Sequence, residues 1–477
     1  MTALIRFGLG PALAICQLLL ISFAVSAEEP HERESCRVCG MYIDQYLKSA
    51  AELVYKDGKK KFTCGVACML REVDDAGGLS AFESVKVHDW VSGKLIDAED
   101  AIYVIGSRVI PDMVPNYIAF ANREEAEAFA AKEGGDVIDF GIAYQDVSPV
   151  GTTAPFRIRT AVTPGAGAFS IGAVYGYMQK DQVKAGSNST DPSEFINSNR
   201  TQPRAPKEVQ AHQQALIVNY SPTDNLSLFV NVPWFERRTK TLVRTSPTSV
   251  RETVGEENGI GDITLEGRYN FWRSTRWDKF GTILLGTTLP TGQFDGERGA
   301  TTDPVAGRRL VSTGPALQLG KDTATFTGGL LYSQRWKDFW FHGSALYAVN
   351  PENDNDFAFG DVATVGAAFH YTPNYDLMLG IEMDASYTQK SEDRGYKIGN
   401  SGGTVTNLAF VFDYRFLNAF GGNFKLRGSV GLPIYEDLNT KHVVLANPRR
   451  EFDQVQLGDG FFGNLAVTWT YRAAPEF

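Results

Sequence analysis

The chain has 477 residues, of which 43% are hydrophobic and 21% are charged, with a formal net charge of −10 and a pI near 5.3. This length exceeds what one ordinary hydrophobic core organises, and the apolar content excludes an intrinsically disordered chain. The acidic balance, with no clustered basic face, excludes nucleic acid as a partner.

The first 27 residues have the features of a cleaved secretory signal peptide. Arg6 supplies a positive charge, Leu13–Val25 is an apolar run, and small residues precede Glu28. We therefore expect residues 1–27, including Cys16, to be removed. Because no later apolar run approaches the roughly 18 residues that a spanning helix requires, we expect no transmembrane helix in the mature chain.

Composition divides the mature chain into two domains. The acidic excess lies within residues 28–146, whereas acidic and basic residues nearly balance over residues 147–477. Residues 147–166 are rich in Pro, Gly, Thr and Ala, which is typical of a linker. We therefore predict an N-terminal domain at 28–146, a linker at 147–166 and a C-terminal domain at 167–477.

The N-terminal domain is predicted to have an α+β fold of two small ββαβ-like units. In the first unit, strands at 50–55 and 61–63 surround an Asp57-Gly58 turn and precede a helix at 65–73. The second unit repeats this order, with strands at 102–105 and 117–120 followed by a helix. Asn122 is the expected N-cap of that helix and Gly134 its end.

In the C-terminal domain, apolar and polar residues alternate over ten or more residues at a time, as between Ile263 and Phe271. Such alternation is typical of strands that separate lipid from a wet lumen, so we predict an antiparallel transmembrane β-barrel. A soluble sandwich is the alternative. The expected strands are 167–178, 209–220, 226–235, 259–272, 280–289, 323–335, 339–349, 361–371, 376–387, 404–416, 423–432 and 458–472.

Connection lengths and side-chain phase agree with a barrel of about twelve strands. Connections alternate between long and short, as they do between the outer and periplasmic ends of outer-membrane barrels. An even strand number returns both barrel ends to the periplasm, so we expect an outer-membrane protein with a periplasmic N-terminal domain. The terminal Phe477 shares the phase of the last aromatic strand, as in the recognition signal of bacterial outer-membrane proteins.

Charged residues of both signs fall on the lumen side of the predicted strands. We expect them to form ion pairs that fill the lumen, and His342, His370 and Met378 share their side. The charged residues are Glu266, Arg268, Glu382, Asp384, Asp413, Arg415, Lys425 and Arg427.

Two sulfur-rich motifs carry the chemistry: Cys36-Arg-Val-Cys39-Gly-Met41 and Cys64-Gly-Val-Ala-Cys68-Met69. Three interpretations compete, namely two local disulfides, a tetrathiolate zinc site and a copper(I) site. Thiolates and thioethers are soft ligands that select copper(I), and Met113 offers another such ligand.

Two further possibilities concern single residues of this domain. A thioredoxin-like redox motif at Cys36 and Cys39 would need a helix to start there, which Gly40 disfavours. His88 is a candidate fourth metal ligand, although a lone His between strand residues is more often structural.

Residues 34–145 resemble NosL, the periplasmic copper(I)-binding accessory protein of nitrous oxide reductase assembly. The resemblance implies that Cys39, Met41 and Met113 hold copper(I). This sequence departs from the family in lacking a lipoprotein anchor, in placing Val114 after Met113, and in carrying the second cysteine pair. The matching stretches are Cys36–Met41, Val87–Trp90, Leu95–Ala98, Tyr103–Ser107, Ile118–Phe120, Glu125–Ala126 and Gly134–Gly135.

The barrel resembles the outer-membrane channel family found in phenol-degradation clusters (the MetA pathway). The matching residues are Asn258–Asp262 with the following Ile-Thr-Leu, and Gly286–Gly292. The resemblance implies a small barrel that passes small solutes.

Together these features predict a protein that binds copper(I) and takes part in copper uptake or in delivery to periplasmic cuproenzymes. Its expected partners are the copper ion, outer-membrane lipid and a periplasmic acceptor protein. The alternatives are a metallochaperone that the barrel merely anchors, without transport, and a disulfide or redox module without copper. No catalytic motif occurs in a convincing setting, so we expect no enzyme.

Overall fold

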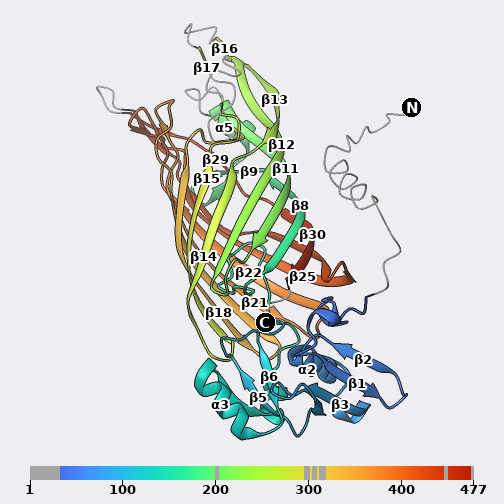
Figure 1. Ribbon diagram of the computed structural model, residues 1–477. Coiled ribbons are helices and arrows are strands. Elements are labelled where there is room, and N and C mark those ends of the chain that lie inside the picture. The colour runs from blue at the N-terminus through green and yellow to red at the C-terminus, as the bar shows by residue number, and fades with distance from the viewer. Residues whose placement is uncertain are drawn as a thin grey trace, which may run out of the picture. The chain divides into compact units, whose positions relative to one another are not determined.

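The computed structural model describes residues 33–198, 204–294, 301–302, 309–310, 318–444 and 450–473. The expected signal peptide and Phe477 lie outside these residues. Ser35–Phe477 forms one compact unit (Figure 1). Within the described ranges, no helix is both long enough and apolar enough to cross a membrane.

The first half of the N-terminal domain is a four-stranded antiparallel sheet covered by one helix. The strand order is β2 (Lys60–Thr63), β1 (Ala51–Tyr55), β3 (Phe82–His88) and β4 (Leu95–Asp97). Helix α2 (Val66–Asp75) buries Met69, Leu70 and Val73 in the core, at the helical spacing that the sequence predicts. The short helices η1 (Ile43–Gln45) and η2 (Leu79–Ala81) complete this half.

The second half has three antiparallel strands and two helices. Its strand order is β6 (Tyr117–Phe120), β5 (Ile102–Ile105) and β7 (Asp136–Asp139). Helix α3 (Arg123–Glu133) begins where predicted, because the Asn122 side chain accepts a hydrogen bond from the backbone N–H of Glu125. Helix α4 (Phe140–Asp146) leads out of the domain. The α+β prediction is confirmed.

The C-terminal domain is a closed antiparallel ring of twelve strands, as predicted (Figure 1). The last strand of the ring, β30, pairs with the first, β8, along its length. The ring consists of β8 (Ala168–Lys180), β11 (Arg204–Tyr220), β12 (Leu226–Ser246), β14 (Ile263–Arg273), β15 (Lys279–Leu289), β18 (Thr325–Trp336), β19 (Phe339–Val349), β21 (Val362–Tyr371), β22 (Leu377–Thr388), β25 (Gly403–Ala419), β26 (Gly422–Leu438) and β30 (Phe462–Arg472).

The long connections between the barrel strands carry additional structure. Residues 236–258, expected to be loop, continue β12 and form most of β13 (Ser249–Ile260), which pairs with it beyond the ring. Leu242 of this hairpin packs with Ile196 and Val250, but most residues of β13 are exposed, so its sequence lacks clear apolar alternation. The other elements there are α5 (Pro192–Ser198), β9 (Gln182–Ala185), β10 (Asn188–Ser189), β16 (Thr301–Thr302), β17 (Arg309–Leu310), β20 (Phe357–Ala358), β23 (Glu392–Asp393), β24 (Tyr396–Lys397), β27 (Lys441–Val444), β28 (Arg450–Asp453) and β29 (Gln456–Gly458).

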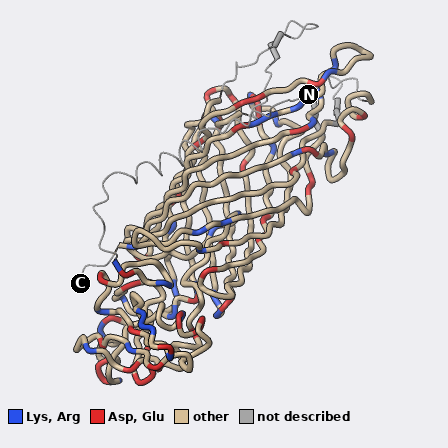
Figure 2. The backbone as a smooth tube through the Cα atoms, turned by 90° about the vertical axis from the view of Figure 1, so that its right-hand side faces the viewer, with Lys and Arg blue, Asp and Glu red and all other residues tan. Residues whose placement is uncertain are grey.

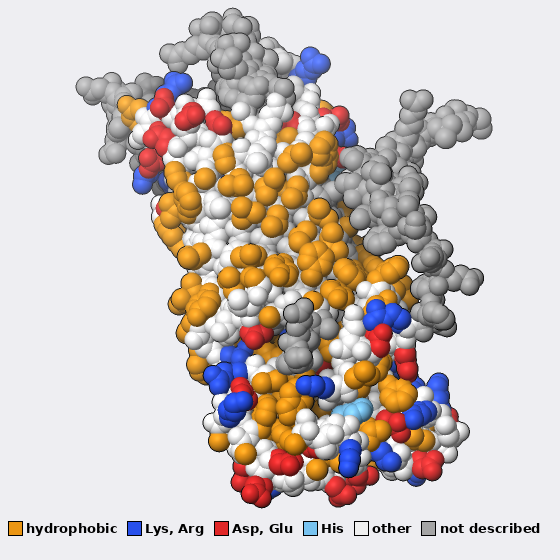
Figure 3. Space-filling view, in the orientation of Figure 1, with side chains coloured by type: hydrophobic (Ala, Val, Ile, Leu, Met, Phe, Trp, Pro, Cys, Tyr) orange, Lys and Arg blue, Asp and Glu red, His pale blue; other side chains and the backbone are white. Residues whose placement is uncertain are grey.

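The two faces of the barrel wall differ as the alternation predicts. In β14, Tyr269 and Phe271 are more than half exposed on the outside, whereas Glu266 and Asn270 are 7% and 3% exposed. Apolar side chains form a broad belt around the visible outer wall (Figure 3), and acidic and basic residues gather in the loops and the N-terminal domain (Figure 2). This is the surface of an outer-membrane barrel.

The predicted lumen charges form ion pairs. Asp413 pairs with Arg427 at 3.2 Å and with Lys425 at 3.7 Å, and Arg268 pairs with Glu266 at 2.7 Å. Because these pairs join neighbouring positions on the inner wall, they neutralise part of the charge that faces the lumen.

Candidate metal centre

Four cysteines from three chain segments converge beside α2. Cys36 and Cys39 lie in a tight turn before η1, in which the backbone N–H of Gly40 donates to the carbonyl of Cys36 at 2.7 Å. Gly40 has a φ of +82°, which the turn requires and which glycine adopts without strain. Cys64 directly follows β2, and Cys68 lies in the first turn of α2.

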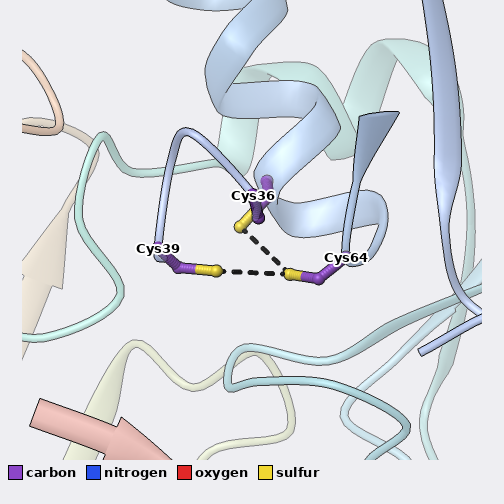
Figure 4. Close-up of side chains that lie close together, drawn as sticks. Cys36, Cys39 and Cys64 are labelled. Carbon is purple, nitrogen blue, oxygen red and sulfur yellow. Dashed lines mark hydrogen bonds between the residues drawn. The ribbon is translucent and has the colours of Figure 1, made fainter. Parts of the chain in front are cut away.

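The four Sγ atoms lie within 4.8 Å of one another, and all four residues are buried. Figure 4 shows the sulfur atoms of Cys36, Cys39 and Cys64 pointing toward one another. Sγ of Cys39 is 3.3 Å from that of Cys64, which is 3.7 Å from Sγ of Cys68. All four are free thiols, and these distances exceed a disulfide bond of about 2.05 Å.

The spacing fits thiolate ligands around a metal ion. With metal–sulfur distances of about 2.3 Å, the edge of a tetrahedral sulfur cage is about 3.8 Å. The two separations given above, 3.3 and 3.7 Å, lie just below that value, so a small outward shift of the sulfur atoms would fit an ion. Soft ligands of this kind suit copper(I) and zinc and disfavour calcium and magnesium. The arrangement therefore favours a metal site over two local disulfides.

The two predicted thioether ligands lie beside the thiols. Sδ of Met113 is 3.4 Å from Sγ of Cys68. Met41 is 4% exposed and belongs to the same buried apolar cluster as the four cysteines, against which Met113 also packs. The structure thus brings together six of the seven predicted ligands.

His88 lies apart from the sulfur cluster. It ends β3, and its Nδ1 is 2.7 Å from the carbonyl oxygen of Ala50. The group of potential metal ligands in the described part of the chain contains the four cysteines without His88. This contact gives the His88 ring a structural role in joining two segments of the domain.

Burial and hydrogen bonding between the thiols lower the pKa of one cysteine and raise the pKa of two others. Burial opposes ionisation of Cys36, but hydrogen bonds from Cys39, Cys64 and Cys68 outweigh it and hold its pKa well below the ordinary value. Burial, together with hydrogen bonds to Cys36, Cys39 and Cys68, raises the pKa of Cys64. For Cys68, the hydrogen bonds to Cys36 and Cys39 are the main cause of a raised pKa. One thiolate solvated by neighbouring thiols is an attractive first ligand for a cation.

Arg71 is a site residue that the sequence analysis did not identify. It lies on α2, is 3% exposed, and its Nη1 donates a hydrogen bond to Sδ of Met113 at 3.2 Å. A charged residue on an amphipathic helix is normally solvated, so only the position of Met113 beside it could have marked Arg71.

One face of the sulfur cluster opens into the barrel. A cavity of about 700 Å³ is lined by Cys39, Met41 and Met113 at one side and by lumen residues such as Arg268 and Asp413 at the other. Cys36, Cys64 and Cys68 do not line it. The cysteine and the two methionines that the family resemblance implies are therefore the sulfur residues that face the lumen.

Hydrogen bonds to the short turns of the barrel hold the loop at residues 36–41, which we call the sulfur loop, at this opening. Nδ2 of Asn423 donates to the carbonyl of Cys39 at 3.1 Å, and Nδ2 of Asn418 donates to that of Arg37 at 2.7 Å. Elsewhere at the same end, Nε1 of Trp277 donates to Oδ1 of Asn116 at 3.0 Å. The domain is thus seated on the barrel at several turns.

Residues 147–166 enter the lumen and contact its wall. Nη2 of Arg159 donates to Glu266 at 2.8 Å, and Arg157 pairs with Asp384. Oγ1 of Thr153 is 2.8 Å from Nε2 of His342 and 3.0 Å from Nδ1 of His370. The segment expected to be a simple linker is therefore a plug within the barrel, and we call residues 147–166 the lumen segment.

Comparisons with known proteins match both parts of the chain. The NosL family model matches residues 27–148. The copper-binding lipoprotein NosL of Stutzerimonas stutzeri is 32% identical over 157 residues, which cover 29% of this chain and 82% of that protein. The solved copper chaperone NosL of Shewanella denitrificans is 26% identical, with a TM-score of 0.21 over 24% of this chain and 93% of its own.

For the barrel, an outer-membrane channel from Pseudomonas putida F1 is similar in structure. It is 13% identical, with a TM-score of 0.45, and the similarity covers 67% of this chain and 100% of that one.

Proposed function

The chain belongs to the NosL family through its N-terminal domain, and from this premise we propose that it binds copper(I) at Cys39, Met41 and Met113 and exchanges the ion through its barrel lumen. One thiolate and two thioethers form a soft ligand set that suits copper(I) and releases it readily to competing thiols. The proposal assigns binding and transfer to the chain, and no catalysis.

The observation that carries the proposal is the shared cavity. Its lining includes these three sulfur residues and also residues of the inner barrel wall. An ion in the lumen therefore meets the ligands without crossing the core of the N-terminal domain. A domain that was only tethered to the barrel would not need its ligands on that side.

The contacts between the N-terminal domain and the short turns of the barrel support delivery of copper toward the periplasm. The domain contacts the ends of the barrel strands at short turns, as Asn418 and Trp277 do. In outer-membrane barrels the short turns are periplasmic, so the domain would face the periplasm and a copper acceptor protein there. We therefore infer a role in copper uptake or in supply to periplasmic cuproenzymes.

Copper(I) titration of the full-length protein in detergent, without oxygen and against a competing chelator, tests the binding site. Cys39→Ser, Met41→Leu and Met113→Leu should each lower the affinity at least tenfold. Met69→Leu is the matched control, because Met69 is fully buried in the core around α2 and does not line the cavity. Equal affinities for all variants and the wild type would refute the site.

A second function, anchoring without transport, is favoured by the lumen segment, because its contacts with Glu266 and Asp384 obstruct the barrel. Proteoliposomes separate the two functions. Copper(I) flux that is lost in Cys39→Ser supports exchange through the lumen. Tight binding without flux would establish a metallochaperone fixed to the membrane by its barrel.

A further inference from the structure

The six sulfur atoms at the site form two sets with different access. Cys39, Met41 and Met113 line the cavity that continues into the lumen. Cys36, Cys64 and Cys68 are each 0% exposed and lie behind them. The outer set is thus accessible to an entering ion, whereas the inner set is reached only through the outer one.

We propose that the inner thiols hold a second copper(I) ion, which shares the thiolate of Cys39 with the first. This inference rests on the proposed function and adds a second ion to it. Sγ of Cys39 lies 3.3 Å from Sγ of Cys64, and the four cysteine sulfurs lie within 4.8 Å of one another. At these separations one thiolate reaches two metal ions, and copper(I) accepts three sulfur ligands.

The inner set has the ligand number and surroundings of a retention site. Together with the shared thiolate of Cys39, the inner set offers four sulfur atoms, of which a trigonal copper(I) ion needs three. Tyr46, Tyr375 and the partly buried Phe62 pack around the same cluster and exclude water. An apolar shell slows ligand exchange and limits oxidation, so the inner ion should remain bound while the outer ion exchanges.

The convergence of the inner thiols is not explained by packing alone. They come from a turn, a strand end and a helix, yet their sulfur atoms meet at one point.

The test is the copper content of the full chain after anaerobic loading with excess copper(I) and desalting. Wild type should retain two copper ions per chain. Cys64→Ser with Cys68→Ser should retain one, held by the outer set. Met41→Leu with Met113→Leu should also retain one, held by the inner set. X-ray absorption of the loaded wild type should show copper–copper scattering, which requires no variant to fold.

Each other outcome overturns the inference. Wild type with one copper ion, undiminished when Cys64 and Cys68 are replaced, would leave the outer site as the whole function. One zinc ion per chain that copper(I) does not displace would make the inner set a zinc site. Absence of copper–copper scattering in wild type would exclude a shared thiolate. Absence of any copper would refute the proposed function as well.

Discussion

Arg71 contacts both the sulfur cluster and the lumen segment. Its Nη1 donates to Sδ of Met113 at 3.2 Å, and its Nε donates to the carbonyl of Ser148 at 2.9 Å. Arg71 follows Cys68 by one turn of α2, so the helix positions a ligand and this guanidinium together. The Arg71 side chain therefore links the hydrogen bonding of Met113 to the position of the first residues of the lumen segment.

We expect Arg71→Met to tighten copper(I) binding. The hydrogen bond occupies a lone pair of the Met113 sulfur, and such a bond contributes about 0.5–1.5 kcal/mol, so the affinity should rise by up to about tenfold. Chelator competition measures the change, and Arg71→Lys, which keeps a donor, serves as the control. Weaker binding in Arg71→Met would show that Arg71 supports the site through its charge or its packing.

Thr153→Val should loosen the lumen segment. The Thr153 hydroxyl contacts His342 and His370, and its loss leaves buried ring nitrogens without this partner, at a cost of about 1–3 kcal/mol. Hydrogen exchange of residues 150–160 should become faster. Thr152→Val is the neighbouring control, since the hydroxyl of Thr152 donates to the carbonyl of Thr153 at 3.3 Å and not to a residue of the barrel wall that the structure describes. Equal exchange in both variants would argue against anchoring by the histidines.

Replacing Arg157 and Arg159 together by Ala should raise the ion conductance of the barrel in planar bilayers. The two guanidiniums hold the lumen segment against Asp384 and Glu266. Their removal frees the segment, leaves Asp384 without this ion pair and leaves Glu266 paired with Arg268 alone, so cation selectivity should also increase. The control is Arg238→Ala, whose half-exposed side chain pairs with Glu256 on the β12–β13 hairpin. Unchanged conductance would mean that other contacts suffice to keep the lumen obstructed.

Gly40→Ala should unseat the sulfur loop from the barrel, whereas Gly58→Ala should not. Both glycines have φ near +80°, so either substitution costs about 1–2 kcal/mol of backbone strain. Only at Gly40 would the new methyl group also overlap with the carbonyl of Gly422. Faster hydrogen exchange in the turn at residues 418–423 is expected for Gly40→Ala alone. Similar protection in both variants would show that the turn adapts.

Stability of the N-terminal domain should depend on pH through Glu72. Burial opposes ionisation of this carboxyl, but hydrogen bonds from Lys61 and Tyr55 outweigh it and hold its pKa below the ordinary 4.5. Its carboxylate therefore stabilises the fold above pH 4.5, and this contribution, about 1.5–3 kcal/mol, is lost as the pH falls through the lower folded value.

Hydrogen exchange of α2 between pH 3 and 6 measures this dependence. Glu72→Gln should be less stable at pH 6 and should show a flatter profile than wild type. Glu127→Gln is the control, because that carboxylate is 60% exposed and lies 3.9 Å from Arg123. A profile of Glu72→Gln parallel to that of wild type would assign the acid sensitivity to other groups.

The barrel was predictable from sequence because its wall has two chemically different faces. Alternation such as that from Ile263 to Phe271 fixes both the strand and its phase. The β12–β13 hairpin escaped prediction because most residues of β13 are exposed, and the cross-strand pairing of residues such as Lys240 and Val254 defines it.

The sulfur ligands were predictable as a group, whereas their grouping into two sets was not. Spacing showed that Cys36 and Cys39 form one pair and Cys64 and Cys68 another. Which sulfur atoms face a cavity depends on how the domain packs on the barrel, and no local pattern encodes that contact. The lumen segment was likewise hidden, since Pro, Gly and Thr suit a linker. Its signal was Arg157 and Arg159, which match lumen carboxylates.

Both ends of the lumen segment lie at the same end of the barrel. The carbonyl of Asp146, just before it, accepts from Nη1 of Arg335, near the short turn that joins β18 to β19. At its far end, Oγ1 of Thr163 donates to the carbonyl of Asp224, in the short turn between β11 and β12. The segment is thus a hairpin pushed in through one mouth, not a thread running from mouth to mouth. Withdrawal of the segment through that mouth would break none of the strand pairs of the ring. The N-terminal domain would stay covalently attached to the barrel.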